Sequence, residues 1–230
     1  MTPEQAKEQA ARAALAELPV TGPDSPEVII GIGTGSTAKL FIDALGALVA
    51  AGQRYVCVPT SKASRAQAEA LGMRVLPDDG PWDIAVTVDG ADEVSDGLDL
   101  IKGGGAAHTR EKIVNYSSRK NVIIVDGSKR SRRLGERWAI PIEVLPFAHL
   151  ATRSHLETHG TPTLRRSGDA PVRTDSGNLI YDLAAGPIAD PGALDAKLRA
   201  IPGVVETGLF VGRADVVLVA SSTGVERLAR

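Results

Sequence analysis

Short apolar runs recur along the first half of the chain and alternate with segments of helical periodicity. The runs that predict strands are Val28–Ile32, Tyr55–Val58, Arg74–Leu76, Ile84–Val88 and Asn121–Val125, and the helical segments are Thr2–Leu18, Ser36–Ala51, Ser61–Leu71 and Thr109–Ser118. Continuous apolar runs are typical of strands buried on both faces, and short turns between strands and helices favour parallel strands. The pattern therefore predicts an α/β fold with a Rossmann-like parallel sheet wrapped by helices.

Near Ser128 the pattern changes to apolar runs separated by hairpin-like signals such as Asp175–Asn178. The predicted strands and helices of this part are Trp138–Leu145, Asn178–Leu183, Pro146–Thr158 and Pro191–Arg199. A buried parallel strand returns at Ala214–Val219. We therefore predict a Rossmann-like catalytic domain over residues 1–130 and 208–230, with a smaller inserted α+β domain over residues 131–207.

Composition narrows the possible partners. Aromatic residues make up 3% of the chain and the formal net charge is -2, which argues against binding to nucleic acid through base stacking or counterion release. No segment approaches the ~20 apolar residues needed to span a bilayer. The single cysteine, Cys57, lies in an apolar run and is interpreted as a small buried hydrophobic residue. We expect a cytoplasmic protein with a small-molecule ligand, no nucleic acid and no membrane partner.

A glycine-rich turn at Gly31–Ala38 is the first candidate site. Glycines let backbone amides approach an anion, the following helix contributes partial positive charge, and Thr34, Ser36 and Thr37 offer hydroxyl groups. A phosphate cradle and a merely tight turn both fit this signal. A dinucleotide site does not fit, because no acidic residue lies between Ala44 and Ala68, and a nucleotide P-loop would need a lysine that is missing here.

Two further motifs follow predicted strands. Asp89, Asp92 and Glu93 come directly after Ile84–Val88, at the sheet edge where α/β proteins bind ligands. Asp89 is the hardest of the three to explain as a solvated acid, and Glu93 is expected to be the solvated one. Downstream, Lys102 precedes three glycines and Glu111 lies near the start of a helix. In isolation such a glutamate would be interpreted as a helix-stabilising charge.

Two other patterns give little information about function. His155 and His159 are spaced like half of a metal site, but Leu156 stands where a zinc peptidase needs glutamate, so a helix end explains them better. The cluster of Arg130, Arg132 and Arg133 is interpreted as a solvated surface run.

Taken in order, these motifs resemble type A ribose-5-phosphate isomerases. The resemblance is carried by Gly31–Ala38, Thr60-Ser61, Asp89–Glu93, Lys102–Lys112, Asp126–Lys129, Ile201–Val205 and Arg213–Asp215. It implies interconversion of ribose 5-phosphate and ribulose 5-phosphate through an enediolate in the non-oxidative pentose phosphate pathway of carbohydrate metabolism. It also implies a homodimer or homotetramer that needs no metal and no cofactor. His108 departs from the pattern, which has an apolar residue there.

The resemblance also implies roles for individual residues. Glu111 would be the base, with Asp89, Asp92 and Lys102 as further catalytic residues. The substrate-binding residues would be Lys7, Thr34, Gly35, Ser36, Thr37, Asp89, Gly90, Ala91, Asp92, Lys102, Gly103, Gly104, Gly105 and Lys129. One carboxylate can carry a proton between neighbouring carbons, and fixed donors can stabilise an oxyanion, so these residue types suit the chemistry. Which of Lys7, Lys102 and Lys129 binds the phosphate stays open.

Two other functions remain as alternatives. One is a different phosphosugar isomerase or an acyl-CoA transferase on a related scaffold. The other is a non-catalytic sugar-phosphate sensor of a transcription regulator, although the chain shows no basic helix-turn-helix segment and a sensor has no use for a base at Glu111.

Overall fold

The computed structural model describes residues 2–22 and 24–230. The chain divides into two compact units, the first with residues 1–90, 110–128 and 213–230 and the second with residues 91–109 and 129–212. The domain boundaries expected from the sequence stay a prediction. Unlike the smaller domain predicted from the sequence, the second unit also contains residues 91–109. The chain therefore crosses from one unit to the other within two of the candidate motifs.

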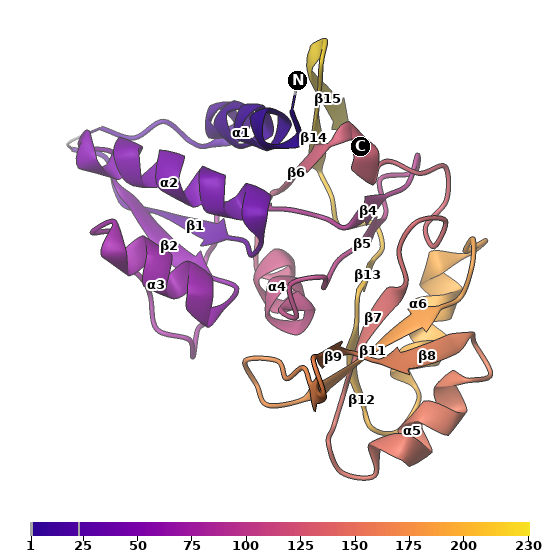
Figure 1. Cartoon of the computed structure of the whole chain (residues 1–230). Helices are drawn as coiled ribbons and strands as arrows, with labels where there is room; N and C mark the ends of the chain where they lie inside the picture. The colour runs from indigo at the N-terminus through magenta and orange to yellow at the C-terminus, as the bar shows by residue number, and fades with distance from the viewer. Residues whose placement is uncertain (1, 23) are drawn as a thin grey trace. The chain divides into compact units, whose positions relative to one another are not determined.

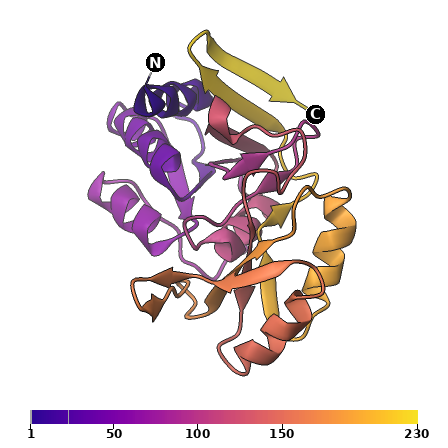
Figure 2. The same ribbon diagram turned by 45° about the vertical axis from the view of Figure 1, so that its right-hand side comes forward.

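The first unit is built on a sheet that, in the described residues, has the strand order β15-β14-β6-β3-β1-β2. Its strands are β1 (Val28–Ile32), β2 (Tyr55–Pro59), β3 (Val86–Asp89), β6 (Asn121–Asp126), β14 (Val216–Ser221) and β15 (Gly224–Ala229). Neighbouring strands are parallel except β15, which forms an antiparallel hairpin with β14 (Figure 2). The predicted α/β fold class is confirmed. The expected strand at Arg74–Leu76 is reduced to one parallel bridge between Val75 and Cys57.

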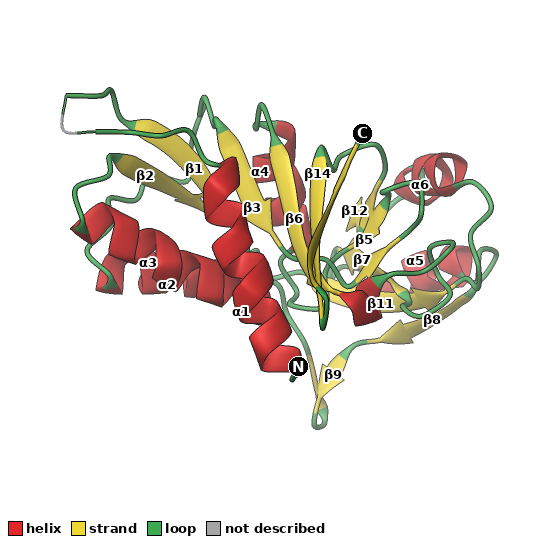
Figure 3. Cartoon of the chain, turned by 90° about the horizontal axis from the view of Figure 1, so that it is seen from above, coloured by secondary structure: helices red, strands yellow, loops and turns green. Residues whose placement is uncertain are grey.

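Helices cover both faces of this sheet. They are α1 (Pro3–Ala14), the 3-10 turn η1 (Leu15–Glu17), α2 (Ser36–Ala50), α3 (Lys62–Ala70) and α4 (His108–Tyr116). Figures 1 and 3 show α1, α2 and α3 on one face and α4 on the other. None of the helices in the described part of the chain has the length and apolar character needed to cross a membrane.

Helix starts and core follow from the sequence. Thr2 caps α1 through its hydroxyl, which accepts from the amide of Gln5 at 3.2 Å, and Gln5 reciprocates in a capping box. Alanines on α1 and large side chains such as Phe41 on α2 pack against the strands. Cys57 is fully buried, and burial raises the pKa of its thiol to about 12. Its interpretation as a buried hydrophobic residue is confirmed.

The second unit contains an antiparallel sheet of order β12-β7-β11-β8 and a small sheet of order β13-β5-β4. The strands of both sheets are β4 (Glu93–Val94), β5 (Leu100–Ile101), β7 (Ile140–Val144), β8 (Thr161–Leu164), β11 (Leu179–Ala184), β12 (Val204–Thr207) and β13 (Leu209–Phe210). The remaining elements of this unit are the hairpin of β9 (Arg166–Ser167) and β10 (Ala170–Pro171) and the helices α5 (His149–Leu156) and α6 (Pro191–Arg199). The 3-10 turn η2 (Gly127–Lys129) lies where the chain crosses from the first unit to the second.

Side-chain alternation along β7 gives this sheet two different faces. Ile140, Ile142 and Val144 join one core cluster with Leu156 of α5 and Leu198 of α6. Because successive strand residues point to opposite faces, the intervening residues of β7 face away from these helices. That second face includes Glu143, whose carboxylate accepts the hydroxyl of Thr109.

Glu17 ties the edge of the first unit's sheet to η1. Its carboxylate lies 2.6 Å from Nζ of Lys120, just before β6, and 2.6 Å from Nε of Arg227 on β15. The side chain is 11% exposed. The hydrogen bond from Arg227, helped by Lys120, lowers the pKa of Glu17 from 4.5 to about 2.

We predict that this carboxylate contributes to acid sensitivity. A lowered folded-state pKa means that Glu17 stabilises the fold above about pH 4.5 and that this contribution is lost as pH falls toward 2. Glu17→Gln should lower the Tm at pH 7 and should flatten the fall in Tm between pH 5 and pH 3. Glu8→Gln, at an exposed pair with Arg12, is the matched control. An unchanged acid slope in Glu17→Gln would contradict the assignment.

Candidate active site

The turn after β1 is shaped by the carboxylate of Asp89. A Cβ atom on Gly33 would collide with Oδ1 of Asp89. The same oxygen accepts hydrogen bonds from the amides of Thr34 at 3.1 Å and Gly90 at 2.7 Å. Asp89 is 3% exposed, so the expectation that it is not a solvated acid is confirmed. Gly35 then takes a φ of 112° as the residue before α2, a conformation that favours glycine.

A hollow of about 510 Å³ opens beside this turn, within the first unit. Its polar lining comes from Thr34, Ser36, Lys39, Ser61, Ser64 and Gln67. The first residues of α2 and the capping residue of α3 both contribute, so two positive helix ends meet there. The Thr34 hydroxyl is bonded within the protein, at 2.7 Å to Thr60 and 2.9 Å to Ser61. The exposed Gly35 and Ser36 and the half-buried Thr37 leave the helix start open to an anion.

The acids after β3 have different surroundings. Asp92 is half-buried, and its Oδ2 accepts the amide of Gly104 at 2.7 Å. Glu93 is fully buried, so its expected solvation is wrong. Its carboxylate accepts from the Ser131 hydroxyl at 2.5 Å and from the amides of Gly135 and Arg137 at 2.8 and 3.0 Å. These donors come from a loop 38 to 44 residues downstream, and their hydrogen bonds offset the free-energy cost of burying the carboxylate.

Lys102 lies at the end of β5 and is 3% exposed. Its ammonium lies 5.5 Å from the ring centre of Phe210, a distance at which a cation is attracted to an aromatic face. Its amide donates to the carbonyl of Gly208 at 2.9 Å. The cation that the motif predicts is therefore buried beside the ring of Phe210 on β13.

The glycines that follow Lys102 form a tight turn. Gly103 has a φ of 115°, and a Cβ there would lie 2.7 Å from Nδ1 of His108. A Cβ on Gly104 would lie 2.6 Å from Oδ1 of Asp92. The amide of Ala106 closes the turn by donating to the carbonyl of Gly103 at 3.0 Å. Gly104 and Gly105 are exposed. Because these glycines have no side chain, the backbone amides and carbonyls of the turn are not covered.

Helix α4 starts at His108 and carries Glu111 in its first turn. Glu111 is 3% exposed. The start of the helix is anchored in the second unit, where the Thr109 hydroxyl donates to Oε2 of Glu143 at 2.5 Å. His108 is fully buried with Nε2 3.4 Å from the carbonyl of Glu206, so an imidazole fills the position expected to be apolar.

Glu143 on β7 is a residue that sequence analysis did not single out. It is 1% exposed, and its Oε1 also accepts from the Thr174 hydroxyl at 2.9 Å and from Nδ2 of Asn178 at 2.7 Å. The available signal was a lone acid within the apolar run Trp138–Leu145. A charged side chain on a buried strand needs hydrogen-bond donors. One donor to Glu143 is Thr109, which lies on the same helix as Glu111.

The remaining candidate cations differ in setting. Lys129 is half-buried, with Nζ 5.0 Å from the ring centre of Trp138. Lys7 pairs with Glu4 one turn earlier on α1 at 2.8 Å, and its side chain is 19% exposed. The half-buried Ala91 lies between the acids of the second motif.

Among residues 2–22 and 24–230, no three histidine, cysteine or acidic side chains gather closely enough to hold a metal ion. His155 lies in the last turn of α5, as expected for a helix end. Independence from metals and cofactors stays a prediction that chelation can test.

Comparison with known proteins decides the family. The family model for ribose 5-phosphate isomerase A (phosphoriboisomerase A) matches residues 56–224. The chain belongs to this family. Ribose-5-phosphate isomerase A of Thermomicrobium roseum is 44% identical over 233 residues, covering 100% of this chain and 96% of the relative. The enzyme of Methanothermobacter thermautotrophicus is 46% identical over 204 residues, covering 87% of this chain and 89% of the relative. The resemblance noted in the sequence is confirmed.

Solved structures of the ribose 5-phosphate isomerase A family agree. A D-ribose-5-phosphate isomerase in complex with phospho-erythronic acid matches with a TM-score of 0.93 and 38% identity, over 100% of both chains. Ribose 5-phosphate isomerase A from Methanocaldococcus jannaschii matches with a TM-score of 0.91 and 37% identity, again over 100% of both chains.

The contact between Gly33 and Asp89 generates a prediction. Gly33→Ala must displace Asp89 or the turn, because a Cβ has no room there. We expect kcat/KM for ribose 5-phosphate to fall roughly 10- to 100-fold, since small displacements of positioning groups are costly. Gly22→Ala is the matched control, because the nearest atom that its new Cβ would meet among the described residues is Oγ of Ser25, at 3.8 Å. Equal activity of both variants would show that the close approach is not required.

Proposed function

We propose that Glu111 is the proton-transferring base with which this ribose-5-phosphate isomerase interconverts D-ribose 5-phosphate and D-ribulose 5-phosphate through an enediolate. The isomerase activity is that of the family to which the chain belongs. The observation that carries the assignment of the base is the burial of Glu111 in the first turn of α4, six residues after Gly105. A carboxylate shielded from water can return to the substrate the proton that it removed.

The isomerisation needs one base to transfer the proton and one set of fixed hydrogen-bond donors to stabilise the oxyanion. Glu111 removes the proton from C2 of the open-chain aldose, the electrons move into the carbonyl, and negative charge develops on the C1 oxygen. The proton returns to C1, while a proton passes from the C2 hydroxyl to the C1 oxygen. We assign stabilisation of the oxyanion to Lys102 and the Gly103–Gly105 backbone.

The acids and the remaining cations complete the proposal. Asp89 and Asp92 would bind sugar hydroxyl groups, together with Gly90 and Ala91, and Asp89 would assist opening of the ring. Thr34, Gly35, Ser36 and Thr37 would receive the phosphate at the start of α2, with Lys129 and Lys7 as cations. Support for the class of ligand comes from the relative that holds phospho-erythronic acid, a phosphorylated sugar acid.

We further propose a cytoplasmic homodimer or homotetramer. The support is the resemblance to the family, and a molar mass of two or four times 24.0 kDa by light scattering is the expected result. A monomer of full activity would overturn it.

The first experiment measures formation of ribulose 5-phosphate by the wild-type protein and by Glu111→Gln. Glutamine keeps the shape of the side chain but cannot accept a proton, so turnover should fall by ~10²–10⁴-fold with little change in Tm. Glu157→Gln, at an exposed position on a pair with Arg153, is the matched control and should keep full activity. Turnover of Glu111→Gln within a few-fold of wild type would assign the proton transfer to another group.

A second experiment tests the expectation that no metal takes part. The sequence brings Asp89, Asp92 and Glu93 together as rival magnesium ligands, but Lys102 is proposed to supply the positive charge that a metal would otherwise provide. After dialysis against EDTA and elemental analysis, activity should be unchanged. A loss that magnesium, manganese or zinc restores would reassign the aspartates as metal ligands.

A further inference from the structure

Arg165, which lies between β8 and β9, contacts the backbone of the glycine turn. Its Nη1 donates to the carbonyl of Gly103 at 2.7 Å and to the carbonyl of Gly104 at 3.2 Å. The side chain is 16% exposed. Neither the sequence motifs nor the proposed function uses this arginine.

Arg165 is itself held on two sides. Its Nε donates to Oδ2 of Asp182 on β11 at 2.9 Å, and its Nη2 donates to Oδ1 of the same carboxylate. A bidentate arginine–carboxylate pair fixes the plane of the guanidinium. The backbone of Arg165 is also fixed, because its amide donates to the carbonyl of Ile180 at 2.8 Å and its carbonyl accepts the amide of Val172 at 2.9 Å.

These contacts fix two peptide planes of the turn. In a trans peptide the carbonyl and the amide of the next residue point in opposite directions. Arg165 binds the carbonyls of Gly103 and Gly104, so the amides of Gly104 and Gly105 point away from it. The Gly104 amide accordingly donates to Asp92 at 2.7 Å on the other side.

Negative and positive groups alternate along this series of hydrogen bonds. It runs from the Asp182 carboxylate to the Arg165 guanidinium, through the peptide between Gly103 and Gly104, to the Asp92 carboxylate. A cation on a carbonyl polarises the peptide and strengthens the amide on its far side as a donor. Glycine has no side chain and the widest backbone freedom, so this turn depends on outside contacts for its conformation.

We propose that Arg165, fixed by Asp182, is a positioning residue that orients the Gly103–Gly105 backbone and Asp92 for the isomerisation. This inference rests on the proposed function, in which the same backbone stabilises the enediolate. Arg165 does not touch the substrate in this scheme. It acts through the turn, so its loss should lower kcat more than it raises KM.

The experiment measures kcat, KM and Tm for Arg165→Ala, Arg165→Lys and the double variant Arg165→Ala/Asp182→Asn. A loose turn should lower kcat of Arg165→Ala roughly 10- to 100-fold with KM within a few-fold of wild type. Arg165→Lys should show an intermediate loss, because an ammonium cannot hold Asp182 bidentately and also span two carbonyls. Added guanidinium ion at concentrations below the unfolding range should restore part of the kcat of Arg165→Ala.

The double variant separates positioning from stability. Removing Arg165 alone leaves the Asp182 charge without its partner, so Asp182→Asn should recover Tm. Under our proposal kcat stays low in the double variant, because the carbonyls of Gly103 and Gly104 still lack their donor. Recovery of kcat together with Tm would overturn the proposal. If Arg165→Ala does not fold, Arg165→Lys decides, and a wild-type kcat in that variant would equally overturn it.

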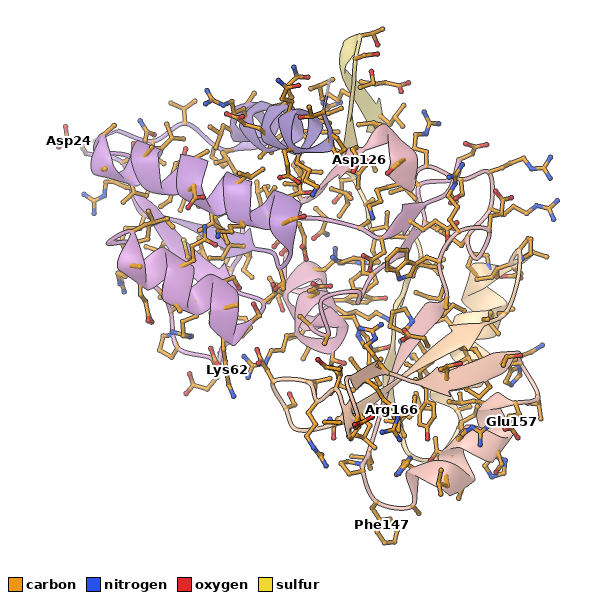
Figure 4. All side chains as sticks on the ribbon, viewed as in Figure 1. Asp24, Lys62, Asp126, Phe147, Glu157 and Arg166 are labelled. Carbon is orange, nitrogen blue, oxygen red and sulfur yellow. The ribbon has the colours of Figure 1, made fainter. Side chains whose placement is uncertain are left out.

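Arg166 provides the matched control. It follows Arg165 directly, is exposed, and donates through Nη1 to the carbonyl of Asp169 within its own hairpin (Figure 4). Arg166→Ala should keep wild-type kcat and show no response to guanidinium. The two hypotheses fail differently: a wild-type protein without isomerase activity refutes the proposed function, whereas an active wild type with an equally active Arg165→Ala refutes only the positioning role.

Discussion

Loops that connect the strands contain backbone amides that have no partner in a sheet, and in this protein buried carboxylates supply that partner. Asp89 accepts the amides of Thr34 and Gly90, and Glu93 accepts those of Gly135 and Arg137. Unpaired buried amides are costly, and a buried carboxylate is costlier, but the two satisfy each other. The conformation of the candidate loops depends on this exchange.

The acidic motif after β3 therefore has a structural role in addition to the chemical role that we propose for it. Sequence reasoning treated Asp89, Asp92 and Glu93 as candidate ligand groups and expected Glu93 to be solvated. Glu93 is instead fully buried. Its donors lie in a loop dozens of residues downstream, which no local pattern connects to it. Spacing along the chain identifies acids that share a turn, but it does not identify the amides that reach them from elsewhere.

The fold was largely predictable, because apolar runs and helix caps are local signals. The helix Pro191–Arg199 has the expected bounds, and Thr2 and Ser61, the first residues of two predicted helical segments, prove to be helix caps. The signals failed where pairing is short or at an edge. β4, β5 and β13 have two residues each, and β15 is a half-exposed edge strand whose charged residues hide its alternation. Tertiary pairing defines such strands, and their own residues do not.

The glycine motifs illustrate what a sequence signal does and does not specify. Gly33 and Gly104 were interpreted as candidate backbone cradles for an anion or oxyanion, yet each also lacks room for a Cβ because an aspartate of the protein lies against it. The requirement for glycine would persist without any ligand. A glycine-rich turn thus indicates a close approach to backbone, and the approaching group can be an internal carboxylate. In this protein the internal acids shape the turns, while the neighbouring Gly35 and Gly105 are exposed.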